Sequence, residues 1–352
     1  MAERVTLKAI AEKANMSISA VSLALRDSPK LPPATRKQLQ AIAAKMGYRP
    51  DPFLSALVAY RTTNSPVIRY GVLAWVDVWP DTTVRERFPG LWAGASKRAE
   101  SMGWQLEEFR MADHGGTAGK FSKILRARGI EGALVAPMPG QSGELALNWP
   151  WFSAVTVGHT LTSPRLHRVT PHQMYNMQLL MRELYALGYR RPGLVIEQLV
   201  NERTHHYWTS AFLDAQMVLP KADRIPYLVR ENTDLSTVSA WRTRHQPDVI
   251  IATRPLDAIA AVEAAGLRVP DDIGVATPAF LAENWKPDST GSNRAGITVA
   301  GIDEHFEAVG AAAIESIVAM INRHDPGVPL SPKHILIEGN WNPGQTVRRM
   351  RG

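Results

Sequence analysis

The residues most able to do chemistry are the cations gathered near the amino terminus. Residues 1–61 contain ten Lys or Arg, at positions 4, 8, 13, 26, 30, 36, 37, 45, 49 and 61. Only four acids, at positions 3, 12, 27 and 51, oppose them, so this segment carries +6 of the chain's formal charge of +7. A basic segment on a nearly neutral body is typical of a polyanion-binding module, although basic helices also occur simply as solvated faces.

Motifs for enzyme chemistry are incomplete in this chain. HGGTAGKF at 114–121 lacks the first Gly of a phosphate-binding loop and the hydroxyl residue after Lys120. GQSG at 140–143 is one residue short of a nucleophile elbow, and no HExxH occurs. The absence of cysteine excludes disulfides and thiolate metal sites. We therefore expect no catalytic residues, no metal and no cofactor.

The apolar pattern up to Met46 predicts three short helices that would carry the basic charge. Asn15 can adopt the left-handed conformation that ends a first helix, and we expect Met16 to fill the corner. Ser17 is a good N-cap for the next helix. Small or buried residues at Ile10, Ala11 and Val21 would let the two helices cross closely, as a helix-turn-helix requires. On pattern alone, an ordinary helical hairpin stays open as the alternative.

Beyond Arg69 short apolar strands alternate with helices, which is typical of a parallel sheet covered on both faces. One series runs through YGVLAWV, GLWAGASKRAESMG, WQLEEF, FSKILRARG, GALVAP and SAVTVG. A second runs through NMQLLMRELYALG, PGLVI, FLDAQ, DVIIAT, AIAAVEAAG and IGVAT, and it is followed by AGITVAG, EAVGAAAIESIVAMINR and HILIEG. The predicted fold class is α/β, with two doubly wound lobes behind a three-helix helix-turn-helix head.

The head resembles that of the lactose-repressor (LacI/GalR) family of bacterial transcription regulators. The likeness is most specific in residues 5–57, from the Val-Thr-Leu start through VS at 21–22, TR at 35–36 and GY at 47–48 to Leu57. The two lobes resemble the periplasmic-binding-protein-like core of that family through LRARGIEGALVAP, MRELYALGYRRPGLV and GLRVPDDIGV. The resemblance implies a sequence-specific regulator, in most cases a repressor, that binds a palindromic operator in double-stranded DNA.

The resemblance also assigns roles to head residues by position. It places Ile18, Ser19, Ala20 and Leu23 against bases in the major groove. Since these side chains are mostly apolar, readout should depend on thymine methyl groups and the Ser19 hydroxyl. The positions that contact phosphates are Thr6, Ser17, Ser22, Thr35 and Tyr48. Leu57, on a hinge helix that starts near Pro52, would wedge into the minor groove beside its copy in the partner subunit.

A small-molecule effector is expected in a cleft between the lobes, where strands of doubly wound sheets end. Trp75, Asp77 and Trp79 follow the first core strand and are the first candidates. The usual carbohydrate clamp of the family is missing. His172-Gln173 stands where many sugar-responsive members have Asp-Asn, and Trp208 stands where they have a ligand-gripping Arg. The sequence leaves the effector open between a sugar and a ring compound.

These observations give an expected organisation for the chain. The ranges are a head at 1–49, a hinge helix at 50–62, a first lobe at 68–167 plus 297–326, and a second lobe at 168–296 plus 327–347. We expect a homodimer, because NWNPGQTVRRMRG after the last strand has no leucine heptad repeat. No membrane segment is expected, and a cytoplasmic, nucleoid-associated location follows. The alternative is a cytosolic ligand-binding protein or enzyme whose helical head serves only oligomerisation.

Overall fold

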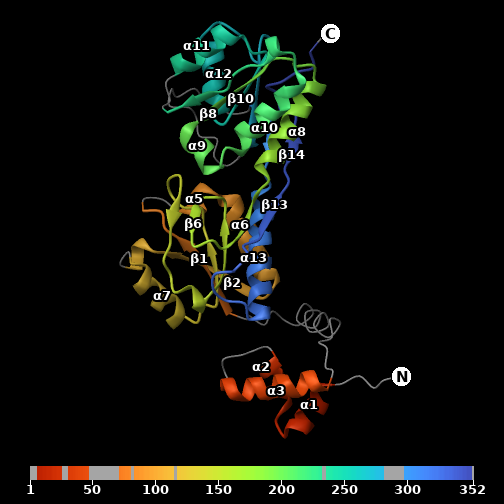
Figure 1. Cartoon of the computed structure of the whole chain (residues 1–352). Helices are drawn as coiled ribbons and strands as arrows, with labels where there is room; N and C mark the ends of the chain where they lie inside the picture. The colour runs from red at the N-terminus through yellow and green to blue at the C-terminus, as the bar shows by residue number, and fades with distance from the viewer. Residues whose placement is uncertain are drawn as a thin grey trace, which may run out of the picture.

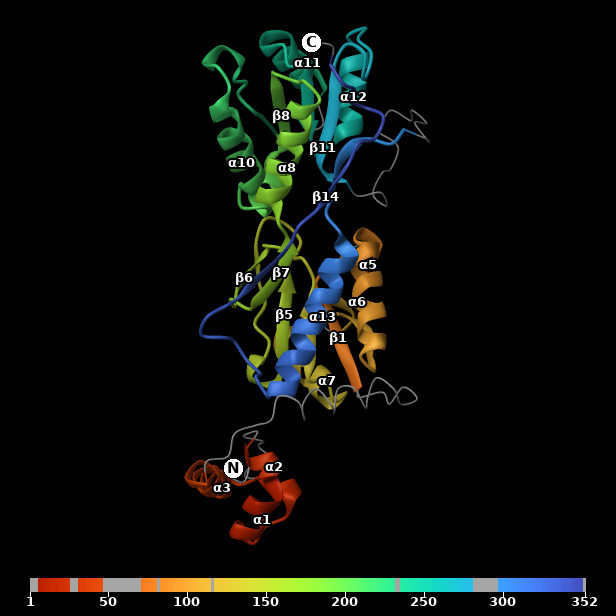
Figure 2. The ribbon, with the colours of Figure 1, turned by 90° about the vertical axis from the view of Figure 1, so that its right-hand side faces the viewer.

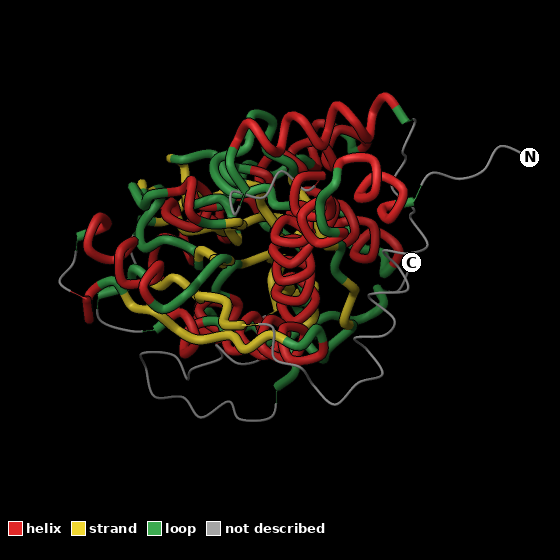
Figure 3. The backbone as a smooth tube through the Cα atoms, turned by 90° about the horizontal axis from the view of Figure 1, so that it is seen from below, coloured by secondary structure: helices red, strands yellow, loops and turns green. Residues whose placement is uncertain are grey.

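The computed structural model of the chain describes residues 6–25, 31–46, 71–80, 83–114, 117–231, 235–280 and 297–350. Within these ranges it shows a three-helix head followed by two α/β lobes (Figure 1). Strands (yellow) lie inside the lobes with helices (red) around them (Figure 3). The predicted fold class is thereby confirmed. The predicted hinge helix at 50–62 lies outside the described residues.

The head consists of α1 Leu7–Ala14, α2 Ile18–Leu25 and α3 Pro33–Lys45. Its core includes Ile10 and Val21, both fully buried, and Leu39 from the third helix. Asn15 ends α1 in the left-handed conformation, with φ 51° and ψ 44°, as predicted. The expectation for Met16 was wrong, because its side chain is 40% exposed. Its backbone N–H closes the corner instead, by donating to the carbonyl of Ala11 at 3.0 Å.

The first lobe is built on a six-stranded parallel sheet in the order β13-β7-β5-β3-β1-β2. Its elements up to the first crossing are β1 Gly71–Asp77, α5 Val84–Arg87, α6 Pro89–Ser101, β2 Trp104–Arg110, η1 Ala112–His114, α7 Ala118–Ala127, β3 Gly132–Val135, β4 Gly143–Glu144, η2 Trp149–Trp151, β5 Ser153–Val157, β6 Leu161–Ser163 and β7 His167–Pro171. Strand residues alternate between two apolar layers. Leu73 and Trp75 face α6 and α13, whereas Ala74 and Val76 face the side covered by α7.

The second lobe is built on another six-stranded sheet, in the order β14-β12-β11-β10-β8-β9. All neighbours are parallel except β12 and β14. Its elements are α8 Gln173–Ala186, β8 Pro192–Glu197, α9 Gln198–Arg203, α10 Tyr207–Ala215, η3 Gln216–Val218, η4 Lys221–Asp223, β9 Leu228–Arg230, α11 Leu235–His245, β10 Val249–Ala252, α12 Pro255–Glu263, β11 Gly274–Phe280, β12 Ala300–Asp303 and β14 Asn340–Asn342. Helices α8 and α10 cover one face of the sheet, and α11 and α12 cover the other.

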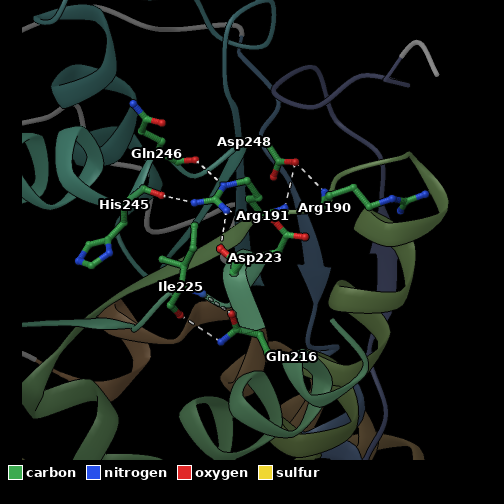
Figure 4. A network of polar contacts seen from close by, with 9 residues as sticks. Arg190, Arg191, Gln216, Asp223, Ile225, His245, Gln246 and Asp248 are labelled. Atoms are coloured by element: carbon green, nitrogen blue, oxygen red, sulfur yellow. Dashed lines mark hydrogen bonds and ion pairs between the residues drawn. The ribbon is translucent and has the colours of Figure 1, made fainter. Parts of the chain in front are cut away.

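A polar network fixes the amino-terminal edge of the second sheet (Figure 4). Arg191, just before β8, donates to the carbonyls of His245 and Gln246 at 2.8 and 3.2 Å and to Asp223 at 3.1 Å. Asp248, just before β10, accepts the backbone N–H groups of Arg190 and Arg191 at 2.6 and 3.0 Å. Through these bonds Arg191 and Asp248 hold the starts of β8 and β10 in place.

The chain crosses between the lobes at three short segments: residue 172, residues 304–305 and residues 338–339. The expected first boundary, between 167 and 168, was too early, because β7 pairs with β5 of the first sheet. The two later boundaries also differ from the expectation. AGITVAG and the helix after it were expected together in the first lobe, but β12 pairs with β11 of the second sheet. The helix α13 Phe306–Arg323 does pack in the first lobe, beside α6 (Figure 2). Strand β13 His334–Ile337 was expected in the second lobe, yet it pairs with β7 of the first sheet. β12 and the helix that follows it, α13, belong to different lobes, because the chain changes lobes at residues 304–305. It changes lobes again at residues 338–339, between β13 and β14.

Asn176, near the start of α8, ties the three crossings together. Its amide oxygen accepts the backbone N–H of Gly339 at 2.9 Å, and its amide nitrogen donates to the Glu304 carboxyl at 3.5 Å. Burial raises the pKa of Glu304 to about 8, with the Asp303 charge adding to the rise and the Asn176 hydrogen bond opposing it. The carboxyl group therefore stays largely protonated at neutral pH, which avoids an unpaired buried charge at the crossing.

Two glycines set the distance between α6 and α13. A Cβ on Gly94 would lie 2.0 Å from the carbonyl oxygen of Glu307, and one on Gly310 would lie 2.2 Å from that of Leu91. Backbone atoms of two helices cannot move apart without disturbing the core between them. We expect Gly94→Ala to destabilise the protein by about 3 kcal/mol through overpacking. Urea denaturation followed by circular dichroism measures this loss.

Gly119→Ala on α7 is the matched control for that substitution. No atom lies within 4 Å of a Cβ built there. The added methyl should be neutral or stabilise the protein by about 0.5 kcal/mol, because alanine has less backbone freedom in the unfolded chain. Equal denaturation midpoints for the two variants would contradict the close helix crossing.

Candidate nucleic-acid interface and inter-lobe site

The start of α2 presents an exposed apolar side chain on the head. Ile18 is 49% exposed, whereas Val21 on the same helix is fully buried in the core. Ala20 and Leu23 are partly buried on the same helix. Ser19 and Ser22 also belong to α2, but their side chains lie outside what the structure describes. An exposed isoleucine in the first turn of a helix suits contact with an apolar group such as a thymine methyl.

Hydroxyl groups stand at the amino termini of the first two helices. The Thr6 hydroxyl oxygen accepts the Ala9 N–H at 3.2 Å, and that of Ser17 accepts the Ala20 N–H at 3.1 Å, which confirms the predicted cap. Both side chains are exposed, so their O–H groups remain able to donate to a phosphate. Thr35 is half-buried in the first turn of α3. Tyr48 and Leu57 lie outside the described residues.

The carboxyl ends of the first sheet place four side chains in a row. Trp79, Met138, His159 and Gln173 follow β1, β3, β5 and β7, which are neighbours in the order β7-β5-β3-β1. The Trp79 indole N–H donates to the carbonyl of Pro137 at 2.7 Å, so its ring spans from β1 to β3. Asp77 is fully buried and holds this turn by accepting the Trp79 backbone N–H at 2.8 Å. Of the five predicted effector residues, Asp77 and Trp79 lie together at this edge.

Of the other three, His172 directly follows β7 at the same edge, whereas Trp75 and Trp208 lie in the cores of the lobes. Trp75 is completely buried between the sheet and α6, with its ring edge-to-face to Trp92 at 5.2 Å. Trp208 is 4% exposed in the core of the second lobe. His172 caps α8 through Nδ1, which accepts the Tyr175 N–H at 3.3 Å.

His159 is the centre of a buried polar network that the sequence analysis missed. Its Nδ1 lies 3.2 Å from Arg168 Nη1, and since a guanidinium only donates, Nδ1 must accept. The other nitrogen, Nε2, then carries the proton and faces Gln173 Oε1 at 3.3 Å and Thr170 Oγ1 at 3.4 Å. Burial, followed by the Arg168 charge, lowers the pKa of His159 to about 4. The ring is therefore neutral at physiological pH.

The segment between α9 and α10 of the second lobe closes over this network. The His205 and Tyr207 rings lie 4.9 and 5.3 Å from the His159 ring, centroid to centroid. His205 and His206 both have left-handed backbones, with φ of 51° and 58°. Such conformations are rare for residues with a side chain and are often found at functional sites. Burial, and then the Arg168 charge, lowers the pKa of His205.

Arg203 joins the two lobes beside these rings. Its Nη1 donates to the carbonyl of Met138 at 2.9 Å and also to that of Gly140, both in the first lobe. The guanidinium lies 5.9 Å from the Trp79 ring centroid, and Arg87 lies over the same ring at 4.1 Å. One aromatic ring thus stands between two cations from different lobes.

The residues that were missed could have been found by the reasoning that selected Trp79. His159 directly follows a predicted strand, SAVTVG, and the run of two histidines and Tyr207 follows the helix after the next lobe's first strand. The sequence carries no signal that His159 and His205 are in contact, because the two residues are far apart in the chain and belong to different lobes.

Comparisons with known proteins agree with this architecture. The model of the bacterial regulatory proteins of the lacI family matches residues 6–51, and a periplasmic binding protein-like domain matches residues 181–347. No curated protein sequence matches the chain.

Solved structures share the fold at low identity. The transcriptional regulator CelR in complex with cellobiose is 17% identical, with a TM-score of 0.53 over 97% of this chain and 100% of that one. The lac repressor dimer bound to operator and the anti-inducer ONPF is 15% identical, with a TM-score of 0.53 over 98% and 99%. A putative LacI-family regulator from Rhizobium etli is 14% identical, with a TM-score of 0.58 over 79% and 99%.

A helix-turn-helix head on a periplasmic-binding-protein-like core defines a DNA-binding transcriptional regulator with an effector-binding domain, not an enzyme. The predicted resemblance to the lacI family is confirmed for the head by the match at residues 6–51, and the core matches a periplasmic binding protein-like domain at residues 181–347. Among the described residues, no helix has the length and apolar character needed to span a bilayer.

The neutral His159 ring makes stability depend on pH. Its pKa falls from an ordinary 6.5 to about 4 on folding, so only the unfolded chain binds a proton at intermediate pH. This contribution to stability is complete above pH 6.5 and is lost as the pH falls toward 4, by up to about 3 kcal/mol. His159→Gln, which can still accept from Arg168, should remove this part of the acid sensitivity. Thermal melts of both proteins across that range test it, and parallel pH profiles would contradict it.

Proposed function

We propose that this protein is a dimeric repressor that binds a pseudo-palindromic operator and releases or grips it when an effector binds between its lobes. The observation that carries the proposal is the α2 surface, where exposed Ile18 lies beside two capped helix termini. An apolar side chain at the start of a recognition helix can contact the methyl group of thymine in the major groove. The lac repressor of similar fold was solved as a dimer on its operator, which supports the same assembly here.

In this proposal the head residues keep the roles that the resemblance implies. Ile18, Ser19, Ala20 and Leu23 read bases in the major groove. The phosphate contacts are Thr6, Ser17, Ser22, Thr35 and Tyr48. Leu57 enters the minor groove beside its copy in the partner subunit and opens a base step. The protein then acts in the cytoplasm, on the DNA of the nucleoid.

The proposed effector site lies where the lobes meet. Asp77 and Trp79 from the first lobe keep their predicted roles, joined by His159 and by Arg203 from the second lobe. His172 keeps its predicted role as well, since it directly precedes Gln173, whose side chain lies within hydrogen-bond distance of His159. The burial of Trp75 and Trp208 supports a packing role for those two rings instead of ligand contact. CelR, of similar fold, was solved with cellobiose, which supports a small polar effector.

Selection of DNA from a random pool by the purified protein tests the function. We expect the recovered sequences to contain two inverted half-sites, because a twofold dimer presents two equal recognition helices. Light scattering should give the mass of a dimer. Recovery of no common sequence would leave the head without a DNA-reading role and favour one in oligomerisation alone.

Ser17 allows the helix cap to be separated from the phosphate contact. Aspartate also caps helices well, so Ser17→Asp should leave the melting temperature unchanged. The added negative charge should repel the DNA backbone and weaken operator binding by roughly tenfold or more. Ser17→Ala should instead cost about 1 kcal/mol of head stability through the lost cap. Fluorescence anisotropy with a selected operator measures binding.

The control for the change in total charge is Ser210→Asp. Ser210 is an exposed residue on α10 in the second lobe. The Ser210→Asp variant should bind the operator like the wild type. If Ser17→Asp also bound normally, Ser17 would be only a cap.

A further inference from the structure

Arg168 is a buried cation at the lobe interface. It lies on β7, 7% exposed, on the face of the first sheet opposite α6 and α13. Its Nη1 donates to His159 and its Nη2 to the carbonyl of Leu161 at 2.8 Å. Its Nε–H is enclosed and has no hydrogen-bond partner in the structure. Removing a guanidinium from water is costly unless an anion compensates for the lost hydration.

No carboxylate in the described part of the chain forms an ion pair with Arg168. The charged or titratable groups around it are Arg165, Tyr207 and the histidines 159, 205 and 334. None of these side chains is a carboxylate. The buried positive charge is therefore left without an anionic partner from the protein residues described.

Arg230 shows how the same protein treats a cation that serves structure. Its side chain is 2% exposed, and it faces Asp257 at 3.4 Å and Glu197 at 3.9 Å. Arg254 also binds Asp257, at 2.7 Å, so this cluster is close to neutral. The contrast indicates that the missing anion near Arg168 is not a general feature of buried arginines here.

The surroundings of Arg168 continue into those of Arg203. The Met138 carbonyl accepts from Arg203, and the Met138 N–H donates to Thr160 Oγ1 at 2.7 Å, directly beside His159. Arg203 also has backbone carbonyls as partners and, within the ranges described, no carboxylate. Each lobe thus contributes one arginine without a described carboxylate partner, Arg168 from the first and Arg203 from the second. Both lie near the carboxyl ends of the strands of the first sheet.

We propose that the effector carries an anionic group, a carboxylate or a phosphate, that pairs with Arg168 between the lobes. This inference rests on the proposed function and names the chemical class of its ligand. The anion would compensate the buried charge, and His205 and Tyr207 of the second lobe would close over it. Neutral sugars lack this group and should bind poorly.

The test uses the full chain with three probes that share a sugar frame: glucose, gluconate and glucose 6-phosphate. At constant ionic strength, at least one of the two anions should raise the melting temperature in the millimolar range, and glucose should not. Gluconate and glucose 6-phosphate distinguish a carboxylate site from a phosphate site. Arg168→Gln, which keeps a donor for Leu161 but no charge, should weaken anion binding by roughly tenfold or more in calorimetry.

Two further variants make the result specific. Arg165→Gln removes the same charge from an exposed position nearby and should leave anion binding unchanged. Arg168→Lys keeps the charge and should retain more binding than Arg168→Gln, which separates loss of charge from loss of folding. The proposal is overturned if neither anion stabilises the wild type, if glucose stabilises it equally, or if Arg168→Gln binds the anions as tightly as the wild type.

Operator binding is measured on the same samples, so the two proposals fail separately. Arg168→Gln should still bind the operator in the absence of any probe. Wild-type protein that binds an anion but selects no DNA would contradict the regulatory function and leave the ligand class standing. Wild-type protein that selects DNA but binds neither anion would contradict the ligand class and leave the regulatory function standing.

Discussion

The structure depends on the way in which three short segments carry the chain between the lobes. Each crossing is only one or two residues long, so the lobes cannot move independently of those segments. The Asn176 amide binds the other two crossings at once, through Gly339 and Glu304. Because burial keeps the Glu304 carboxyl largely protonated, the contact is a neutral hydrogen bond without an unpaired charge.

A second set of contacts joins the lobes directly, at the row of strand ends of the first sheet. Arg203 of the second lobe donates to the carbonyl group of Met138 in the first lobe, and the ring of His205 lies against that of His159. These are few and polar, in contrast to the glycine-lined packing of α6 against α13 within one lobe. An interface of few polar contacts has a small free-energy difference between open and closed forms, which is the condition for a ligand to shift the balance. Dimer geometry would pass that shift to the two heads.

Much of the secondary structure could be predicted from the chain, and the failures have physical causes. Runs such as GALVAP and DVIIAT became the buried strands β3 and β10, because central strands of a parallel sheet are apolar on both faces. Strand β7 was not predicted, since His167 and Arg168 interrupt its apolar run. Arg168 and Thr170 reach the His159 network at the lobe interface, so two of the polar residues that hid the strand belong to the site.

By itself the sequence determined the head, the α/β class and the family, because these follow from local spacing: a left-handed Asn15, a capping Ser17 and periodic apolar residues. Only the tertiary structure decided which lobe β12 and β13 join, since strand pairing depends on partners more than a hundred residues away for β13. It also decided that Trp75 packs in the core and that, among the residues that the structure describes, no carboxylate pairs with Arg168. Burial and counter-charge are properties of what surrounds a side chain, and residue spacing does not contain them.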